Sequence, residues 1–131
     1  MNRIKVAVYG SLRKGHGNHG ILEGSKLLGK QRLPNLEMFS LGGFPGIRKG
    51  ESSILTEVYE VNGSTLEQLD TLEGFRHGSS DSFYDREDVD TDFGDALIYT
   101  LQGDRYQGLP IVESGDWSKH SAPTINFNSN T

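Results

Sequence analysis

The sequence predicts an α+β domain, and three stretches of the chain carry this prediction. Residues 4–9 place large apolar side chains on alternate positions, which is typical of a strand with one buried face. Residues 53–61 are apolar on both faces, so this strand is either central in a layered sheet or part of a closed barrel. Residues 64–73 combine a Ser-Thr-Leu-Glu capping box with a leucine stripe, and Gly74 ends the predicted helix.

Composition restricts the class of protein before any motif is considered. A chain of 131 residues is the size of one domain, and its formal net charge of -5 argues against nucleic acid as the main partner. The absence of Cys excludes a disulfide framework and a thiolate nucleophile. The start of the chain lacks a signal-peptide pattern, and no apolar run is long enough to span a membrane. We therefore expect a soluble cytoplasmic protein that binds a small molecule.

The first strand leads into a glycine-rich loop that we predict to be a binding site. Gly10 lets the backbone turn, so that the N–H groups of Ser11, Leu12 and Arg13 can converge on a carboxylate or another anion. We expect Asn18 to cap a single helical turn that runs to Gly24. The alternative for the whole stretch is an ordinary surface loop. His19, beside this loop, is a candidate general base, but a solvated loop histidine needs no special geometry and is the simpler interpretation.

The middle of the chain reads as strands and turns. We predict strands over residues 26–33 and 36–41, followed by a rigid turn over 42–46. The Gly-x-x-x-x-Gly-Lys pattern within 24–31 lacks the Ser or Thr and the helix of a phosphate-binding loop. Residues 85–91 and 96–101 form a predicted hairpin. Its alternating acidic residues fit the wet face of an edge strand better than a metal site, and no calcium-loop spacing is present.

Glu73 is the candidate general acid and base. It ends the predicted helix, where the last carbonyl groups carry partial negative charge and disfavour a carboxylate by about 0.3–1 kcal/mol. Its neighbours Leu72 and Phe75 are apolar, and their burial would raise its pKa further. A carboxyl group with a pKa near neutrality can both accept and donate a proton. The alternative is a solvated glutamate like Glu67.

Four separated segments of the chain resemble the gamma-glutamylcyclotransferase-like superfamily. The segments are Tyr9-Gly10-Ser11-Leu12-Arg13 with the following Asn18, the aromatic-Pro pair Phe44-Pro45, Leu69-Asp70-Thr71-Leu72-Glu73-Gly74 with Tyr84-Asp85-Arg86, and Ser114-Gly115-Asp116-Trp117. They span most of the chain. One departure is the polar insert 76–82, which is longer than expected and which we interpret as a flap near the site.

The resemblance implies a small mixed β-barrel flanked by one main helix and short helical turns, formed by residues 1–117. Residues 118–131 are rich in Ser, Asn and Thr, and we expect them to form a poorly ordered tail. The resemblance also implies cyclisation of a gamma-glutamyl group to 5-oxoproline with release of an amine, without metal or cofactor. Glu73 would be the catalytic acid and base, and the substrate would contact Tyr9, Gly10, Ser11, Leu12, Arg13, Asn18 and Tyr84. We expect a monomer or weak dimer. The alternative is a module on the same fold that binds a small anionic metabolite without turnover.

Overall fold

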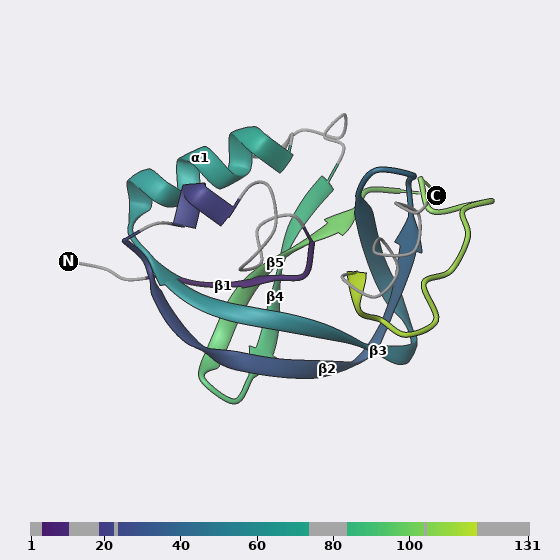
Figure 1. Cartoon of the computed structure of the whole chain (residues 1–131), viewed down its shortest axis with the longest axis horizontal. Helices are drawn as coiled ribbons and strands as arrows, with labels where there is room; N and C mark the ends of the chain where they lie inside the picture. The colour runs from purple at the N-terminus through teal and green to yellow at the C-terminus, as the bar shows by residue number, and fades with distance from the viewer. Residues whose placement is uncertain (1–3, 11–18, 23, 74–83, 104, 118–131) are drawn as a thin grey trace, which may run out of the picture.

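A computed structural model describes residues 4–10, 19–22, 24–73, 84–103 and 105–117 (Figure 1). The elements follow the order β1 (Ile4–Val8), η1 (His19–Leu22), β2 (Lys26–Ser40), β3 (Pro45–Val61), α1 (Gly63–Glu73), β4 (Tyr84–Thr91) and β5 (Gly94–Leu101). No helix within these ranges is long and apolar enough to cross a membrane. The tail 118–131 and the insert 76–82 lie outside the described residues.

The five strands form one mixed sheet in the order β2-β3-β1-β5-β4. β1 pairs antiparallel with β3 and parallel with β5, where Val6 lies opposite Leu97. β1 is therefore the central strand, which explains why Val6, Ala7 and Val8 are all buried. The predicted hairpin is confirmed as β4 and β5, and β4 is an edge strand of the sheet.

The predicted closed barrel is wrong, because the sheet stays open between its two edge strands, β2 and β4. Two contacts join the hairpins at the end near the β4–β5 turn. Gln31 Oε1 accepts a hydrogen bond of 2.9 Å from the Asp92 N–H, and Gly29 lies against the ring of Phe93. Side chains rather than a ladder of backbone hydrogen bonds therefore hold the two edges together there.

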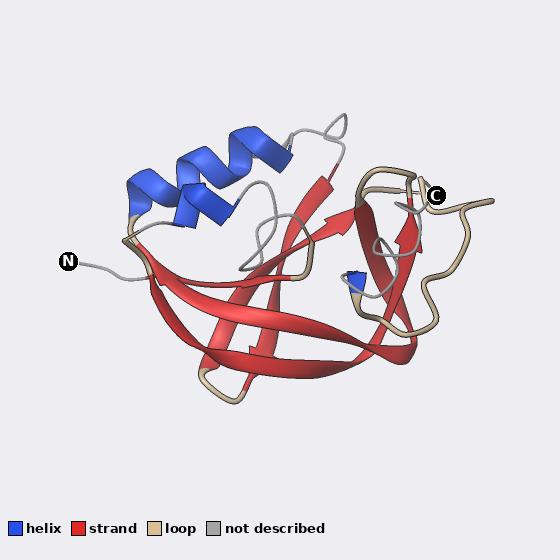
Figure 2. Ribbon diagram, in the orientation of Figure 1, coloured by secondary structure: helices blue, strands red, loops and turns tan. Residues whose placement is uncertain are grey.

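β2 and β3 make one long hairpin instead of the shorter strands predicted from the sequence. The predicted strands 26–33 and 36–41 are parts of the single strand β2, which ends one residue earlier, at Ser40. The register shift between Pro34 and Leu36 marks a bulge. Asn35 there has a φ of 63°, a left-handed conformation that Asn tolerates better than most residues. The hairpin bends, and its far half passes over the end of β5 (Figure 2). Pro45 and Gly46, predicted as turn residues, begin β3 beside the Leu101 side chain.

The main helix lies against one face of the sheet (Figure 1). Its cap is Asn62, whose Oδ1 accepts the Thr65 N–H at 2.8 Å, and not Ser64 as the capping-box pattern predicted. The helix therefore begins one residue earlier, at Gly63. Leu69 is fully buried, whereas Leu72 is 40% exposed, so the predicted leucine stripe is shorter than expected.

The sheet separates two clusters of buried side chains. One, on the helix side, includes Val6, Tyr59 and Leu69. The other, on the opposite face, includes Ala7, Leu36 and Ile98. Both faces of β1 and β3 are consequently buried. For residues 53–61 the sequence showed this and left a layered sheet and a barrel open, whereas the single buried face predicted for residues 4–9 is wrong, because β1 is the central strand.

Candidate active site

Glu73 is a partly buried carboxyl group at the C-terminal end of α1. Burial raises its pKa from 4.5 to about 7. The sequence predicted this direction and burial as one of its causes. Of the two apolar neighbours named for that burial, Leu72 is exposed and Phe75 lies outside the described residues. A carboxyl group with this pKa is close to half ionised at neutral pH, which suits proton transfer in either direction.

Three buried tyrosines lie within electrostatic reach of Glu73. Burial is the main cause that raises the pKa of Tyr9, Tyr84 and Tyr99, and the charge of Glu73 raises each of them further. All three phenols therefore stay protonated at neutral pH. Tyr9 and Tyr84 come from opposite ends of the predicted site in the sequence, and the fold brings both to the same carboxyl group.

The hydroxyl groups of the three tyrosines each donate a hydrogen bond within the protein. Tyr9 donates to the backbone carbonyl of Tyr99 at 2.7 Å, and Tyr84 donates to the carbonyl of Pro45 at 2.6 Å. Tyr99 donates to Asp70 Oδ1 at 2.6 Å. These bonds fix the rings in place, and they leave Glu73 as the group of this cluster whose protonation changes near neutral pH.

Asp70 joins the helix to the β4–β5 hairpin. Its Oδ1 accepts the Tyr99 hydroxyl, and its Oδ2 accepts a bond of 2.6 Å from Arg86 Nη1. Arg86 and Tyr99 lie opposite each other in the antiparallel register of the hairpin. Because Asp70 precedes Glu73 by three residues, both carboxyl groups lie on one side of the helix. This ion pair holds the last turn of α1, and with it Glu73, against the sheet.

Gly10 places the start of the predicted binding loop beside the same cluster. A Cβ atom at Gly10 would stand 2.8 Å from Pro45 Cγ, so the close approach of these two segments requires glycine. Pro45 is also the residue that accepts the Tyr84 hydroxyl. The structure therefore brings Tyr9, Gly10, Tyr84 and Glu73 to one region. The other predicted site residues, Ser11, Leu12, Arg13 and Asn18, lie outside the described residues.

Sequence reasoning missed several residues of this region. Tyr99 carried no signal beyond strand alternation, and Pro45 was predicted only as part of a rigid turn. The pairing of Asp70 with Arg86 could have been found from their place in the two halves of one motif. Glu57 is only 2% exposed and accepts the Tyr59 hydroxyl at 2.9 Å. The signal for Glu57 was its place in the alternation, since it lies between Leu55 and Tyr59 on an apolar face of the strand.

No group of three or more His, Cys, Asp or Glu residues suited to a metal ion occurs in the described ranges. A cavity of about 620 Å³ opens elsewhere in the fold, lined by β2, β3, β4 and β5. None of the residues described around Glu73 lines this cavity, so it is a feature separate from the Glu73 cluster.

A model of the family described as gamma-glutamyl cyclotransferase, AIG2-like matches residues 6–119. The chain belongs to this gamma-glutamyl cyclotransferase family. A Vibrio cholerae relative is 40% identical over 113 residues, which are 86% of this chain and 93% of that protein. The gamma-glutamylcyclotransferase family protein YtfP of Escherichia coli is 37% identical over 114 residues, 87% of this chain and 96% of YtfP.

Two solved structures share the fold of this chain. The solution structure of Escherichia coli YtfP matches with a TM-score of 0.71 at 34% identity, over 89% of this chain and 98% of YtfP. The crystal structure of an uncharacterized Pyrococcus horikoshii protein matches with a TM-score of 0.75 at 29% identity, over 89% of this chain and 92% of that chain.

Burial of Glu73 predicts that the fold loses stability as the pH rises from about 4.5 to about 7. In this window the folded state keeps a proton that the unfolded state releases, so the free energy of unfolding falls, by about 3 kcal/mol in total. Glu73→Gln should remove this fall. Urea unfolding at both ends of the window measures it: the variant should match the wild type at pH 4.5 and exceed it at pH 8. Parallel curves for the two proteins would contradict the raised pKa.

Proposed function

We propose that this chain is a gamma-glutamylcyclotransferase-type enzyme that cyclises a gamma-glutamyl group to 5-oxoproline and releases an amine or amino acid. Membership of the family supports the reaction class. The observation that carries the assignment to this chain is the Glu73 carboxyl group, with a pKa near 7, beside three fixed tyrosines and the exit of β1. Because the relatives are named only at the level of the family, the amine that leaves is not specified by them.

The reaction needs one group that moves protons in two directions. The α-amine of the glutamyl group attacks its own side-chain carbonyl carbon and forms the ring C–N bond, while the Glu73 carboxylate takes a proton from the attacking nitrogen. The resulting carboxylic acid gives a proton to the leaving nitrogen as the old C–N bond breaks. The cyclisation conserves atoms and charge, and it needs no water molecule. A pKa near 7 serves both steps, because neither protonation state is strongly favoured.

The remaining residues serve alignment. The loop that begins at Gly10 would hold the α-carboxylate of the substrate through its N–H groups, and this part of the proposal rests on residues beyond those described. Folding the flexible glutamyl chain so that amine and carbonyl meet can lower the barrier by several kcal/mol. The hydrogen bonds of Tyr9, Tyr84 and Asp70 reported above would keep the side chains around Glu73, and Glu73 itself, in fixed positions.

Incubation of the purified protein with a panel of gamma-glutamyl amines and dipeptides tests the proposal. Mass spectrometry should detect 5-oxoproline and the free amine in equal amounts from at least one member of the panel. No release from any member, combined with saturable binding of 5-oxoproline, would replace the enzyme by a non-catalytic module that binds small anions.

The pH dependence of turnover should report Glu73. Since the base form is needed to accept the first proton, kcat/KM should rise with pH and level off above about pH 7. Initial rates from pH 5 to 9 measure this rise. A kcat/KM that is already level across this range, as expected for a base with the ordinary glutamate pKa of about 4.3, would show that the buried carboxyl group is not the base.

Chelators should leave turnover unchanged, because every proton transfer in the proposed mechanism is assigned to Glu73. The four His residues (16, 19, 77 and 120) also lack the paired spacing typical of a catalytic metal. Rates measured before and after dialysis against EDTA should agree. A loss of activity that zinc or magnesium restores would contradict the mechanism.

A further inference from the structure

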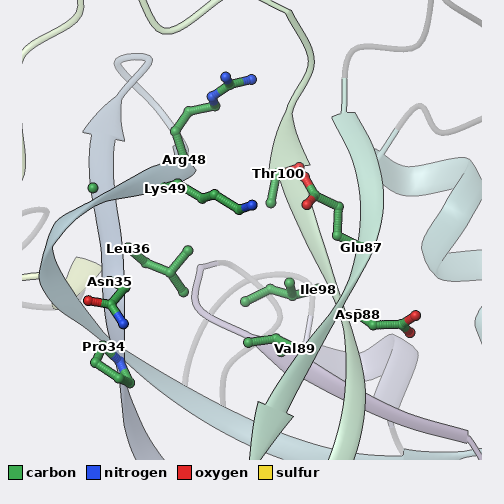
Figure 3. Close-up of a pocket in the computed structure, with 11 residues that line it drawn as sticks. Pro34, Asn35, Leu36, Arg48, Lys49, Glu87, Asp88, Val89, Ile98 and Thr100 are labelled. Atoms are coloured by element: carbon green, nitrogen blue, oxygen red, sulfur yellow. Dashed lines mark hydrogen bonds between the residues drawn. The ribbon is translucent and has the colours of Figure 1, made fainter.

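The cavity of about 620 Å³ lies along the open seam of the sheet, between edge strands β2 and β4. We call it the seam cavity. It is lined by Pro34, Asn35, Leu36, Arg48, Lys49, Gly50, Glu87, Asp88, Val89, Ile98 and Thr100 (Figure 3). Its volume falls within the range typical of small-molecule sites, about 300–1,000 Å³.

Two features of the hairpins create the seam cavity. The contacts of Gln31 and Gly29 with the β4–β5 turn close one end of the seam. Beyond them, the bulge at Asn35 interrupts the pairing of β2 with β3 where the hairpin bends. In a closed barrel, β2 and β4 would pair along this seam. They do not pair, and the space left between Leu36 on β2 and Val89 on β4 is the cavity.

The floor of the seam cavity is apolar, and its walls carry opposite charges. Leu36 and Ile98 are buried members of one core cluster, and Val89 packs against it. In Figure 3 the Lys49 side chain extends from β3 toward Glu87 and Thr100 on the opposite wall. The two walls therefore present an ammonium and a carboxylate above an aliphatic surface.

These two charges do not neutralise each other directly. Within the described part of the chain, the Lys49 side chain makes no hydrogen bond or ion pair. The Glu87 carboxylate accepts a bond of 2.6 Å from the Thr100 hydroxyl, which fixes one of its oxygens and leaves the other available.

The other charged side chains of the lining are directed elsewhere. Arg48 donates to the carbonyl groups of Leu101 and Gly103, at 3.0 and 2.8 Å, and its guanidinium lies 4.9 Å from the centre of the Tyr106 ring. Asp88 points away from Lys49 in Figure 3. Lys49 and Glu87 are thus the charged pair that faces the seam cavity.

We propose that the seam cavity is a second binding site, specific for a small zwitterion with an aliphatic body, of which an aliphatic amino acid is the simplest example. The ligand carboxylate pairs with the Lys49 ammonium, and its ammonium pairs with the Glu87 carboxylate. Its side chain covers Leu36, Val89 and Ile98. A ligand of this kind bridges two charges that the protein alone leaves apart, whereas an ion of one sign would leave either Lys49 or Glu87 unmatched.

L-Leucine and two analogues that each lack one charge test the proposal: 4-methylpentanoate, without the ammonium, and 3-methylbutylamine, without the carboxylate. The full chain is titrated with each compound and followed by two-dimensional amide NMR. We expect saturable shifts for L-leucine at the residues of the seam cavity, and at least about fivefold weaker binding for both analogues, equivalent to about 1 kcal/mol.

Matched variants assign the two charges. Lys49→Met and Glu87→Gln should each weaken L-leucine binding at least about fivefold, or about 1 kcal/mol. Lys26→Met and Glu113→Gln change exposed residues outside the cavity. These two variants should bind L-leucine as tightly as the wild type does. Glu73→Gln should also bind L-leucine normally, so this test is independent of the proposed catalysis.

Three results would overturn the proposal. The first is the absence of saturable shifts at the seam cavity up to ~50 mM L-leucine, far beyond the millimolar range of a weak specific site. The second is equal binding of 4-methylpentanoate, which would leave only an anion contact at Lys49. The third is a set of shifts confined to residues around Glu73, which would place the ligand in the candidate active site.

Discussion

Glu73→Gln is expected to lower turnover about 100-fold or more, the usual contribution of a positioned general acid and base. The substitution keeps the volume of the side chain and most of its hydrogen bonds, but it removes the proton that the carboxyl group exchanges near pH 7. The loop after Gly10 is unchanged, so binding of 5-oxoproline should stay within about tenfold, or about 1.4 kcal/mol. Steady-state rates and calorimetric titration measure the two effects separately.

Glu67→Gln is the matched control for this result. Glu67 lies on the same helix but is exposed, and the structure places the helix cap at Asn62 rather than in a capping box with Glu67. Its substitution should change neither the rate nor the stability measurably. If Glu73→Gln keeps more than about a tenth of the wild-type rate, the general base must be another group. Asp70 and His19 are then the next candidates.

Gly115→Ala is expected to destabilise the fold by about 2–5 kcal/mol, the largest stability effect that we predict. Gly115 has a φ of +67°, which costs an L-residue about 1–2 kcal/mol. An added Cβ would also overlap the Ser53 carbonyl oxygen and approach Ile54 Cα at 3.1 Å. Both atoms belong to the backbone of β3 and cannot rotate away. Because the Leu55 N–H bonds the Gly115 carbonyl at 2.8 Å, moving Gly115 would also break this hydrogen bond.

Gly108→Ala separates the steric clash from the backbone conformation. Gly108 has a φ of +78°, but no atom lies within 4 Å of its added Cβ. It should therefore lose only about 1–2 kcal/mol. Urea unfolding of the two variants measures the difference. Equal losses would show that the segment after Val112 can move away from β3, and the contact with Ser53 would then contribute nothing to stability.

The sequence predicted individual strands and the helix better than it predicted whether the sheet closes into a barrel. The alternation of β1, the acidic edge strand β4 and the helix that ends at Glu73 were all recoverable, because each depends on short-range periodicity. Whether the sheet closes depends on one bulge at Asn35 and on contacts such as that of Gln31 with Asp92. These contacts join residues far apart in the sequence, and no local pattern reports them.

In the candidate site, too, residues marked by a local pattern could be predicted, and residues placed by long-range contacts could not. Glu73 could be predicted from the end of its helix and from the family motif. Tyr99 could not, because its role depends on the register of β5 against β4 and on the hydrogen bond to Asp70. The direction of the Glu73 pKa shift and burial as a cause were both predictable from the sequence. The residues that bury the carboxyl group were not, because they are set by the tertiary packing of strands and helix.

The central position of β1 has a consequence for the order in which the protein matures during synthesis. Tyr9 is made early, yet the carbonyl that accepts its hydroxyl belongs to Tyr99, 90 residues later. Contacts of such high sequence separation form late, because a long loop must close first. A nascent chain that ends before β5 also lacks Tyr99, one of the two partners of Asp70. Glu73 would keep the ordinary acidity of a solvated glutamate until the β4–β5 hairpin docks, so the proton chemistry proposed for it begins only after β5 has been made.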